Sequence, residues 1–365
     1  MVAMPKLGIS IYPEKSTLEQ DKAYLDLAHK YGFKRVFTSL LQINGDKEEV
    51  LRDFKKIVSY ANELGMEVMV DIAPSLFKQL EISYDDLSFF HSMGAYGIRL
   101  DVGYTGSEEA RMTRNPYGLK IEINMSAGTK YLDQIMSYSP NRENLMGSHN
   151  FYPMMYTGLD YDFFVSCSKD FRKHNIHTAA FVNSQDATFG PWAICDGLVS
   201  LEDHRALPIE TQVKHLMLTG LIDDIMIGNA YASEAELKAM SEAFYAPQPS
   251  LKVDLKEAAT EVETKIVFDE LHSYRGDRSA YMLRSTMTRI KYANEDFPPH
   301  DTDDIKRGDV LVCNNELGHY NGELQIALKE MKNTGRVNVV GRICESEMIL
   351  LDHVRPWSTF KLVRA

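Results

Sequence analysis

Three acidic residues lie near the ends of consecutive β-rich segments in the first half of the chain. Asp71 lies in EVMVDIA, Asp101 ends YGIRLD, and Glu122 lies in LKIEIN. Alternation along each segment places these carboxylates opposite the aliphatic side chains, on the same face as Arg99. Buried charges are costly unless they are paired or used in chemistry. We therefore predict that Asp71, Asp101 and Glu122 are catalytic acids and bases; an ion pair of Arg99 with Glu122 or Asp101 is the structural alternative.

Further polar residues fall at the ends of the same and later β-rich segments. His149, Asn150 and Tyr152 lie in SHNFYP, and their side chains suit the hydroxyl and acetamido groups of a sugar. Glu202 and Arg205 lie in a long polar connection, which is often functional, although a solvated charge run is the alternative. The predicted substrate-binding residues are Ser39, Arg99, Asn124, His149, Asn150, Tyr152, Asn183, Glu202 and Arg205.

A phosphate-binding turn is predicted after the last β-rich segment of this region. Ser233 and Glu236 form a capping-box pattern that begins a helix, and Gly228, Asn229 and Ala230 come shortly before it. Backbone N–H groups at this place bind phosphate in many parallel barrels. We expect the N–H groups of these three residues to be free for such a ligand.

A divalent metal ion is the competing use of the three carboxylates, because Mg²⁺ and Mn²⁺ sites take acids from neighbouring strands. Arg99 would share that space and repel the ion, and the first β-rich segment has no H-x-H pair. The four cysteines, Cys167, Cys195, Cys313 and Cys344, show neither C-x-x-C nor zinc-ligand spacing. We expect no metal and no other cofactor.

These side chains need a scaffold that gathers many strand ends. Eight β-rich runs alternate with helical patterns such as 17–32 and 47–65, both of which end at glycine. This count and length match an α/β fold of the TIM (β/α)8 type, with catalytic residues at the C-terminal strand ends. A doubly wound sheet is the alternative, but no glycine-rich dinucleotide turn follows the first run. The runs are 7–12, 34–40, 67–73, 96–101, 119–124, 143–152, 177–183 and 223–229.

A second domain follows the barrel. Pro247 and Pro249 end the last helical pattern and begin an extended linker. Alternating strands separated by turns such as RGD and KRGD fill the rest of the chain. We predict a barrel over residues 1–245 and a small β-rich barrel or sandwich over residues 246–365.

Charge and composition restrict the partners. The chain has 52 acidic residues against 40 lysines and arginines, a net charge of −12. Such a surface repels nucleic acid and anionic membranes, and no Lys/Arg-rich run is present. No apolar run approaches the roughly 20 residues of a membrane span, and the N-terminus lacks a secretory signal pattern. We expect a cytoplasmic protein that binds neither nucleic acid nor membrane.

Several motifs occur in order along the chain: GISIYPE, FTSL, DIAPS, IRLDVG, HNFYP…YTGLD and LEDHR. Together they resemble the bacterial 6-phospho-N-acetylmuramidase family, formerly a domain of unknown function and sometimes labelled outer surface protein. The resemblance covers essentially the whole chain and implies a TIM barrel with a cyclophilin-like C-terminal β-barrel. It also implies hydrolysis of the β-1,4 bond of MurNAc 6-phosphate–GlcNAc during cytoplasmic recycling of cell-wall sugars. Met154 and Met155 depart from the family, whose members often carry Arg or Gln just after the proline.

The predicted carboxylates fit such a reaction. Glycosidases use one protonated and one ionised carboxyl group, about 5–5.5 Å apart for retention and about 6.5–9.5 Å apart for inversion. The implied substrate is doubly anionic, so Arg205, the turn 228–230 and Arg284 are candidate anion contacts. We expect the second domain to cover the barrel mouth and supply Arg284; a stability module or a homodimer contact is the alternative. Competing functions are a metal-dependent sugar-phosphate isomerase or lyase and a non-catalytic sugar-phosphate binding protein.

Overall fold

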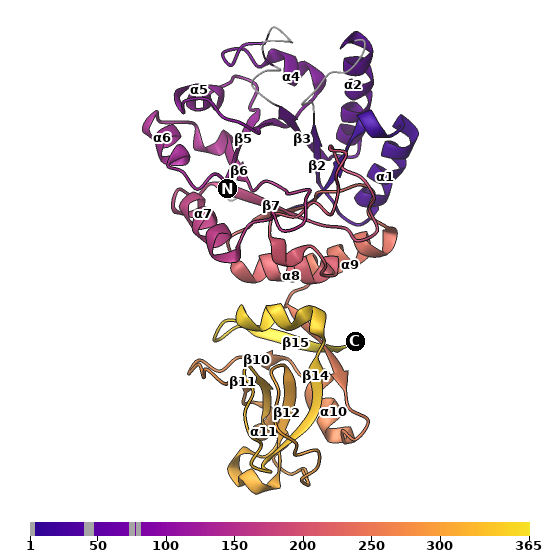
Figure 1. The fold of residues 1–365 in the computed structure, drawn as a ribbon, viewed down its shortest axis with the longest axis vertical. Helices are drawn as coiled ribbons and strands as arrows, with labels where there is room; N and C mark the ends of the chain where they lie inside the picture. Colours follow the sequence, from indigo (N-terminus) through magenta and orange to yellow (C-terminus); the bar gives the residue numbers. More distant parts are fainter. Residues whose placement is uncertain (1–3, 40–46, 73–76, 78–81) are drawn as a thin grey trace. The chain divides into compact units, whose positions relative to one another are not determined.

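Eight parallel strands close into a barrel in the first part of the chain (Figure 1). They are β1 (Leu7–Ile11), β2 (Arg35–Ser39), β3 (Glu67–Ile72), β4 (Gly97–Leu100), β5 (Lys120–Asn124), β6 (Leu145–Ser148), β7 (His177–Val182) and β8 (Asp224–Ile227). The computed structural model describes residues 4–39, 47–72, 77 and 82–365. Each strand pairs with the next, and β8 pairs with β1. All eight strands lie within the β-rich runs of the sequence, so the predicted TIM barrel is confirmed.

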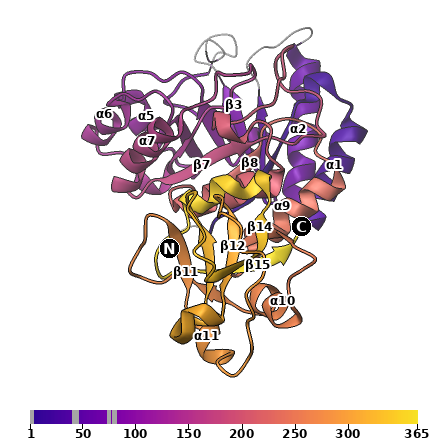
Figure 2. The ribbon, with the colours of Figure 1, turned by 60° about the horizontal axis from the view of Figure 1, so that its bottom comes forward.

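Helices surround the strands on the outside of the barrel (Figure 2). They are α1 (Leu18–Lys30), α2 (Lys47–Glu63), α4 (Ser88–Met93), α5 (Ser107–Met112), α6 (Tyr131–Ser137), α7 (Tyr161–Lys173), α8 (Ile209–Thr219) and α9 (Glu234–Tyr245). Thr17 begins α1 with a capping box to Gln20. Gly32 and Gly65 follow α1 and α2 with φ of +83° and +70°, a left-handed conformation that glycine adopts without strain. Both glycine stops are as predicted.

The inward-facing side chains form successive layers inside the barrel. At the strand starts, the buried Arg35 lies between Glu122 and Asp224. Phe37 and Phe181 fill the next layer edge to face, with ring centroids 5.2 Å apart. The layer at the strand ends is polar and forms the candidate site. The alternate residues of the strands are aliphatic and belong to the core under the helices, which confirms the predicted alternation.

The second part of the chain is a seven-stranded, nearly closed sheet. Its elements are β9 (Ser250–Leu255), α10 (Glu261–Phe268), β10 (His272–Ser273), β11 (Met282–Ser285), α11 (Thr288–Lys291), β12 (Asp309–Cys313), β13 (Leu324–Ala327), β14 (Val337–Ile343) and β15 (Thr359–Arg364). The strand order is β10-β15-β9-β14-β12-β13-β11. The two edge strands meet, because His272 Nδ1 lies 3.1 Å from Ser285 Oγ and the Arg275 N–H donates to the Arg284 carbonyl. A β-barrel-like second domain is therefore present, as the family resemblance implies.

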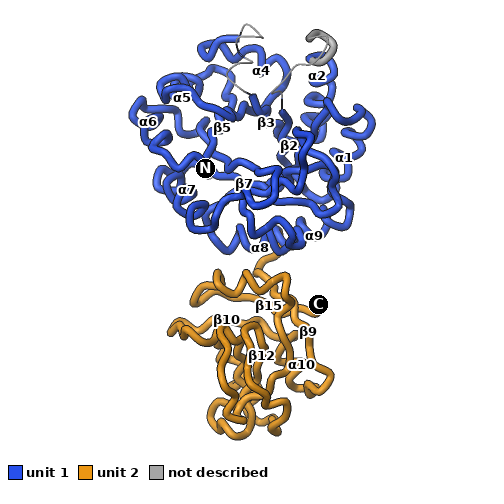
Figure 3. Tube along the Cα trace, in the orientation of Figure 1, with its two compact units in different colours: residues 1–244 blue, residues 245–365 orange. Residues whose placement is uncertain are grey.

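The two parts form separate compact units, residues 1–244 and 245–365 (Figure 3). Each has its own buried core, and a fully buried large apolar side chain contributes about 1.5–3 kcal/mol to folding. All four cysteines are free thiols. Within the described residues, no helix combines the length and the apolar character needed to cross a bilayer.

Candidate functional site

Arg99 organises the polar layer at the strand ends. It lies on β4 directly beside Asp71 of β3, and both side chains are almost fully buried. Arg99 Nη1 donates to Asp71 Oδ1 at 2.7 Å and lies 3.5 Å from Asp101 Oδ1. Its Nε donates to Ser148 Oγ at 2.9 Å, and its Nη2 donates to Asn150 Oδ1. One guanidinium group therefore fixes side chains from β3 and from the ends of β4 and β6.

The two aspartates beside Arg99 have different surroundings. Asp71 is 3% exposed, whereas the side chain of Asp101 is 39% exposed. Burial raises the pKa of Asp71 to about 6, although the Arg99 charge acts in the opposite direction. The two contacts of Arg99 Nη1 limit the distance between Asp71 Oδ1 and Asp101 Oδ1 to about 6 Å at most, nearer the spacing of retaining than of inverting glycosidases. The site thus combines a carboxyl group that binds a proton near pH 6 with one that faces solvent.

Glu122 lies in a different layer, toward the strand starts. Its Oε2 accepts from Arg35 Nη2 at 2.7 Å, and Arg35 Nη1 donates to Asp224 Oδ2 at 2.8 Å. His177 Nε2 lies 2.9 Å from the same Asp224 oxygen. Arg99 makes its ion pairs with the aspartates, so the alternative pairing of Arg99 with Glu122 is not found. Glu122 is 1% exposed, and its carboxylate binds Arg35 at the strand starts. This placement does not favour a catalytic role for Glu122, which stays a prediction.

His149, predicted to contact the substrate, is buried inside the protein. Its ring is inaccessible to solvent and stacks on Phe164 with centroids 4.2 Å apart. Burial lowers the pKa of His149 to about 3, so the ring is neutral at physiological pH. The short polar sequence SHNFYP predicted a site here but did not show which of its side chains turn inward. Direct contact between His149 and a ligand is not supported by this placement.

The hydrogen bonds of His149 order the residues after β6. Ser168 Oγ donates its hydrogen to the Phe164 carbonyl, and His149 Nε2 lies 2.8 Å from Ser168 Oγ. Because Ser168 Oγ can then only accept from the ring, His149 Nε2 carries the proton. His149 Nδ1 is then the acceptor for Ser126 Oγ at 3.2 Å. Ser126 Oγ in turn accepts the Asn150 N–H at 2.9 Å. Because Asn150 binds Arg99, His149 positions the site through Ser126 and Asn150.

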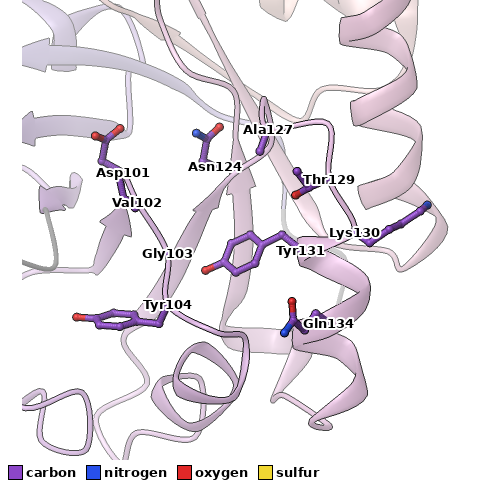
Figure 4. Close-up of a pocket in the computed structure, with 10 residues that line it drawn as sticks. All are labelled: Asp101, Val102, Gly103, Tyr104, Asn124, Ala127, Thr129, Lys130, Tyr131 and Gln134. Atoms are coloured by element: carbon purple, nitrogen blue, oxygen red, sulfur yellow. The ribbon is translucent and has the colours of Figure 1, made fainter.

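A cavity of about 480 Å³ lies beside Asp101, at the C-terminal ends of β4 and β5 (Figure 4). Figure 4 shows the Asp101 carboxylate and the Asn124 amide on one part of its wall, and Tyr131 and Gln134 of α6 on another. Cavities of this size with a few polar groups are typical of small-molecule sites. The lining residues are Asp101, Val102, Gly103, Tyr104, Asn124, Ala127, Thr129, Lys130, Tyr131 and Gln134.

A buried carboxylate holds the two tyrosines of this cavity. Glu109 is inaccessible to solvent and accepts hydrogen bonds from the Tyr131 hydroxyl and the Tyr104 N–H. It also accepts the Gly106 N–H at 2.7 Å. Burial, aided by the Glu109 charge, raises the pKa of Tyr104 to about 12, so its hydroxyl stays protonated. The cavity wall is therefore fixed from behind by α5.

Four residues that order the barrel interior or the cavity wall were not predicted from the sequence. Arg35 alternates with Phe37 along β2, so the same alternation that placed the aspartates could have placed it inside the barrel. Glu109 lies in α5, Tyr104 in the connection before α5, and Tyr131 at the start of α6. No period-two pattern in these segments predicts where their side chains point. Their position after β4 and β5 is the one signal the sequence offers.

Glu202 and Arg205, predicted to bind substrate, bind each other and the surrounding backbone. Arg205 Nε and Nη2 donate to the two Glu202 carboxylate oxygens, each at 2.7 Å, and the arginine lowers the pKa of Glu202 to about 2. Arg205 Nη1 donates to the carbonyls of Tyr152, Asp196 and Gly197, each at 3.1 Å. These contacts hold the loops after β6 and β7 together. The Arg205 guanidinium is therefore occupied within the protein, which does not support its use on a phosphate.

The predicted phosphate turn is also engaged with the protein. The Gly228 N–H donates to the carbonyl of the last β7 residue, and the Ala230 N–H donates to the loop between β7 and α8, both at 2.9 Å. Asn229 Oδ1 accepts the Ser184 N–H, and Asn183 Oδ1 accepts an N–H of the same loop, again at 2.9 Å. The expectation of free N–H groups at Gly228 and Ala230 is wrong, because the turn packs against this loop. The predicted capping box before α9 is confirmed.

Three further predicted residues have distinct placements. Ser39 ends β2 directly beside Asp71, within the polar layer. Tyr152 is half-buried after β6, and burial raises the pKa of its hydroxyl. Arg284 lies on β11 of the second unit, where its Nε donates to Oε1 of the fully buried Glu323 at 2.7 Å. The barrel mouth thus gathers Ser39, Asp71, Arg99, Asp101, Asn124, Asn150 and Tyr152 at one set of strand ends.

Comparisons with known proteins cover both units. A family model described as 6-phospho-N-acetylmuramidase, N-terminal, matches residues 7–242, and one described as 6-phospho-N-acetylmuramidase, C-terminal, matches residues 249–363. An uncharacterized B. cereus protein of known structure is 50% identical, with 99% of this chain and 100% of that chain covered and a TM-score of 0.91. A conserved Enterococcus faecalis protein of unknown function is 25% identical, with 99% and 96% covered and a TM-score of 0.76. The comparison with curated proteins found no match.

Proposed function

The chain belongs to the 6-phospho-N-acetylmuramidase family, and we propose that it hydrolyses the β-1,4 bond of MurNAc 6-phosphate–GlcNAc. The observation that supports this most directly is the pair Asp71 and Asp101, which Arg99 holds together; Asp101 lines an open cavity. Two carboxyl groups with different surroundings are what glycoside hydrolysis requires. The products are GlcNAc and MurNAc 6-phosphate, and the reaction belongs to the recycling of cell-wall sugars in the cytoplasm.

In the proposed mechanism Asp71 is the proton donor and Asp101 the nucleophile. The Asp71 proton moves to the glycosidic oxygen while an Asp101 oxygen bonds to C1 of MurNAc, and the C1–O bond breaks to release GlcNAc. The ionised Asp71 then takes a proton from water, whose oxygen bonds to C1 and displaces Asp101. C1 is inverted twice, so the product keeps the β configuration. The assignment rests on the raised pKa of the buried Asp71 and on the solvent exposure of Asp101.

The neighbouring polar groups support these two roles. Arg99 Nη1 lies 3.5 Å from Asp101 Oδ1, and Asn150 and Ser148 hold the Arg99 guanidinium in place. We propose that Ser39, Asn124 and Tyr152 bind the hydroxyl and acetamido groups of the substrate. Glu122 remains the third candidate carboxylate and is tested by substitution below.

The phosphate contact remains a prediction. Arg205 and the turn 228–230 are engaged within the protein. Arg284 is the other predicted side chain, although its Nε and Nη2 donate to Glu323. A metal-dependent isomerase or lyase is the competing enzyme class. Arg99 places a positive charge between Asp71 and Asp101, where a divalent ion would bind, and this supports the metal-free mechanism.

The proposal is tested with the purified protein and two disaccharides, MurNAc 6-phosphate–GlcNAc and its unphosphorylated form, each with and without EDTA. Mass spectrometry should show release of GlcNAc from the phosphorylated compound alone, at a rate that EDTA does not change. A rate abolished by EDTA would indicate the metal-dependent class. Binding of the disaccharide without any cleavage at micromolar enzyme would indicate a binding protein and contradict the proposal.

A further inference from the structure

We propose that the cavity beside Asp101 is the subsite for the uncharged sugar that leaves, an N-acetylhexosamine, and that the phosphorylated sugar lies on the other side of the carboxylates. This inference rests on the proposed function, because it assumes that Asp101 acts at the bond between the two sugars. The cavity begins at Asp101 and extends over the ends of β4 and β5 to α6 (Figure 4). A group bound there is therefore adjacent to the bond that is cleaved.

The charge of the cavity disfavours an anionic occupant. Asp101 and Lys130 are its charged lining residues. The Lys130 ammonium lies 3.6 Å from Asp133 Oδ2, its side chain is 81% exposed, and Figure 4 shows it extending away from Asp101 and Tyr131. Of the charged lining residues this leaves the Asp101 carboxylate, and Arg99 behind it is shared with Asp71. The protein as a whole has a net charge of −12. A phosphate, which carries about 1.5–2 negative charges at neutral pH, would be repelled, whereas a neutral sugar would not.

The polar groups of the cavity suit hydroxyl and acetamido groups. Asn124 Oδ1 accepts the Ser126 N–H at 2.7 Å, which fixes the amide and leaves its Nδ2 with no partner among the described residues. The Gln134 amide and the Thr129 hydroxyl likewise have no partner in the described part of the chain, so a ligand can replace their water. The Tyr131 hydroxyl donates its hydrogen bond to Glu109 and can therefore act toward a ligand only as an acceptor. Together these groups offer both donors and acceptors without a net charge.

Gln134 is the residue to change, because it is exposed on α6 and is no part of the carboxylate machinery. Gln134→Ala should raise KM for MurNAc 6-phosphate–GlcNAc by about 5- to 10-fold, as expected for the loss of one hydrogen bond to a ligand. The variant should leave kcat/KM unchanged for an aryl glycoside of MurNAc 6-phosphate, which has nitrophenol in place of GlcNAc. Gln134→Glu and Gln134→Lys should differ by less than about 3-fold, since a neutral occupant does not respond to the sign of the charge.

Lys130→Gln tests the charge argument, and Lys55→Gln is its matched control. Lys55 lines a second cavity of about 400 Å³ with Lys22, Arg52 and Lys56, away from the strand ends. Both variants should keep the wild-type preference for the phosphorylated disaccharide. A loss of that preference by 10-fold or more in Lys130→Gln or Gln134→Glu, but not in Lys55→Gln, would place the phosphate in the cavity and overturn the inference. An equal effect of Gln134→Ala on both substrates, or no effect on either, would overturn it too.

Failure of the proposed function is distinguished by the wild-type protein. If the wild type does not cleave the disaccharide, calorimetric titration with GlcNAc still tests the cavity in the full chain. GlcNAc should bind the wild type and bind Gln134→Ala about 5-fold more weakly. Absence of GlcNAc binding, or equal binding to both proteins, would overturn the inference.

Discussion

At the scale of single residues, Asp71 and Asp101 show how position alone separates two identical side chains. Arg99 contacts both, but Asp71 is buried among the barrel side chains while Asp101 reaches the cavity. Burial disfavours the ionised form, and the arginine compensates only in part, so Asp71 keeps a raised pKa. Different surroundings of two carboxyl groups divide the acid and base roles in other glycosidases too.

The raised pKa predicts the pH dependence of the rate. Since Asp71 must be protonated to donate and its pKa is about 6, we expect kcat/KM to fall as the pH rises above about 6. Asp71→Asn should lower kcat by about 100-fold or more and remove this dependence. Rates measured from about pH 5 to about pH 8 check both expectations. A wild-type profile that is flat over this range would contradict the role of Asp71.

The same ionisation affects stability. Asp71 binds its proton more tightly in the folded protein than in the unfolded chain. The free energy of unfolding should therefore decrease as the pH rises from about 4 to about 6. In Asp71→Asn this contribution disappears. Urea denaturation of both proteins at several pH values measures the difference.

Substitution of Glu122 distinguishes a structural role of this carboxylate from a catalytic one. Glu122→Gln removes one of the two buried partners of Arg35, and breaking a buried pair costs about 3–5 kcal/mol of unfolding free energy. We expect this destabilisation with kcat retained in the folded fraction. Glu234→Gln, which removes an exposed partner of Lys30, is the matched control and should leave stability nearly unchanged, because exposed ion pairs contribute little. Loss of activity at unchanged stability would instead assign Glu122 to the reaction.

At the scale of elements, the segment after β6 connects the core to the site. The buried ring of His149, the hydroxyl of Ser126 and the backbone of Asn150 form one chain of hydrogen bonds that ends at Arg99. None of these groups except Arg99 touches the carboxylates. The strand end therefore acts as a support that keeps the guanidinium in one orientation.

Ser126→Ala tests this support. It removes the acceptor of the Asn150 N–H and the partner of His149 Nδ1, which should lower the unfolding free energy by about 1–3 kcal/mol. We expect kcat to fall because Arg99 loses its orientation, and the pH profile to keep its shape because the neutral His149 does not titrate in that range. Ser137→Ala, at an exposed serine of α6, is the control. A shifted pH profile in Ser126→Ala would contradict the account.

Element patterns also explain what the sequence could and could not predict. Period-two alternation placed Asp71 and Arg99 on the inner face of the barrel, where they are found. Alternation predicts which face of the sheet a side chain occupies but not its position along the barrel axis. Because the strands of a barrel are tilted and staggered, Glu122 of β5 lies level with Arg35 at the start of β2. The cavity tyrosines lie outside the strands, where no regular pattern gives their direction. The contacts of Arg205 depend on how two loops fold together, which sequence alternation does not describe.

At the scale of the whole molecule, the proposed function requires an acidic protein to hold a doubly anionic substrate. The net charge of −12 excludes non-specific attraction, so local groups must supply the recognition. The barrel mouth supplies carboxylates and neutral polar groups, and its arginines are engaged within the protein. The source of the cation stays a prediction, and Arg284, which is itself bound to Glu323 of its own unit, is the predicted residue.

Arg284→Gln tests that contribution. The variant should raise KM for the phosphorylated disaccharide by about 10-fold or more and leave kcat nearly unchanged. It should also destabilise the second unit, because the buried Glu323 loses its closest partner. Lys265→Gln, which removes an exposed ion pair on α10, is the control for both measurements. Destabilisation without any change in KM would confine Arg284 to the structure of its own unit.

The most direct test of the account is the configuration of the first-formed product. Two carboxylates no more than about 6 Å apart should act by double displacement, so MurNAc 6-phosphate should be released with its β configuration. Proton NMR of the anomeric signals during the first minutes of hydrolysis, before mutarotation, measures this. Appearance of the β anomer first is the predicted result. Appearance of the α anomer first, or no hydrolysis of the phosphorylated disaccharide, would contradict the proposed action of Asp71 and Asp101.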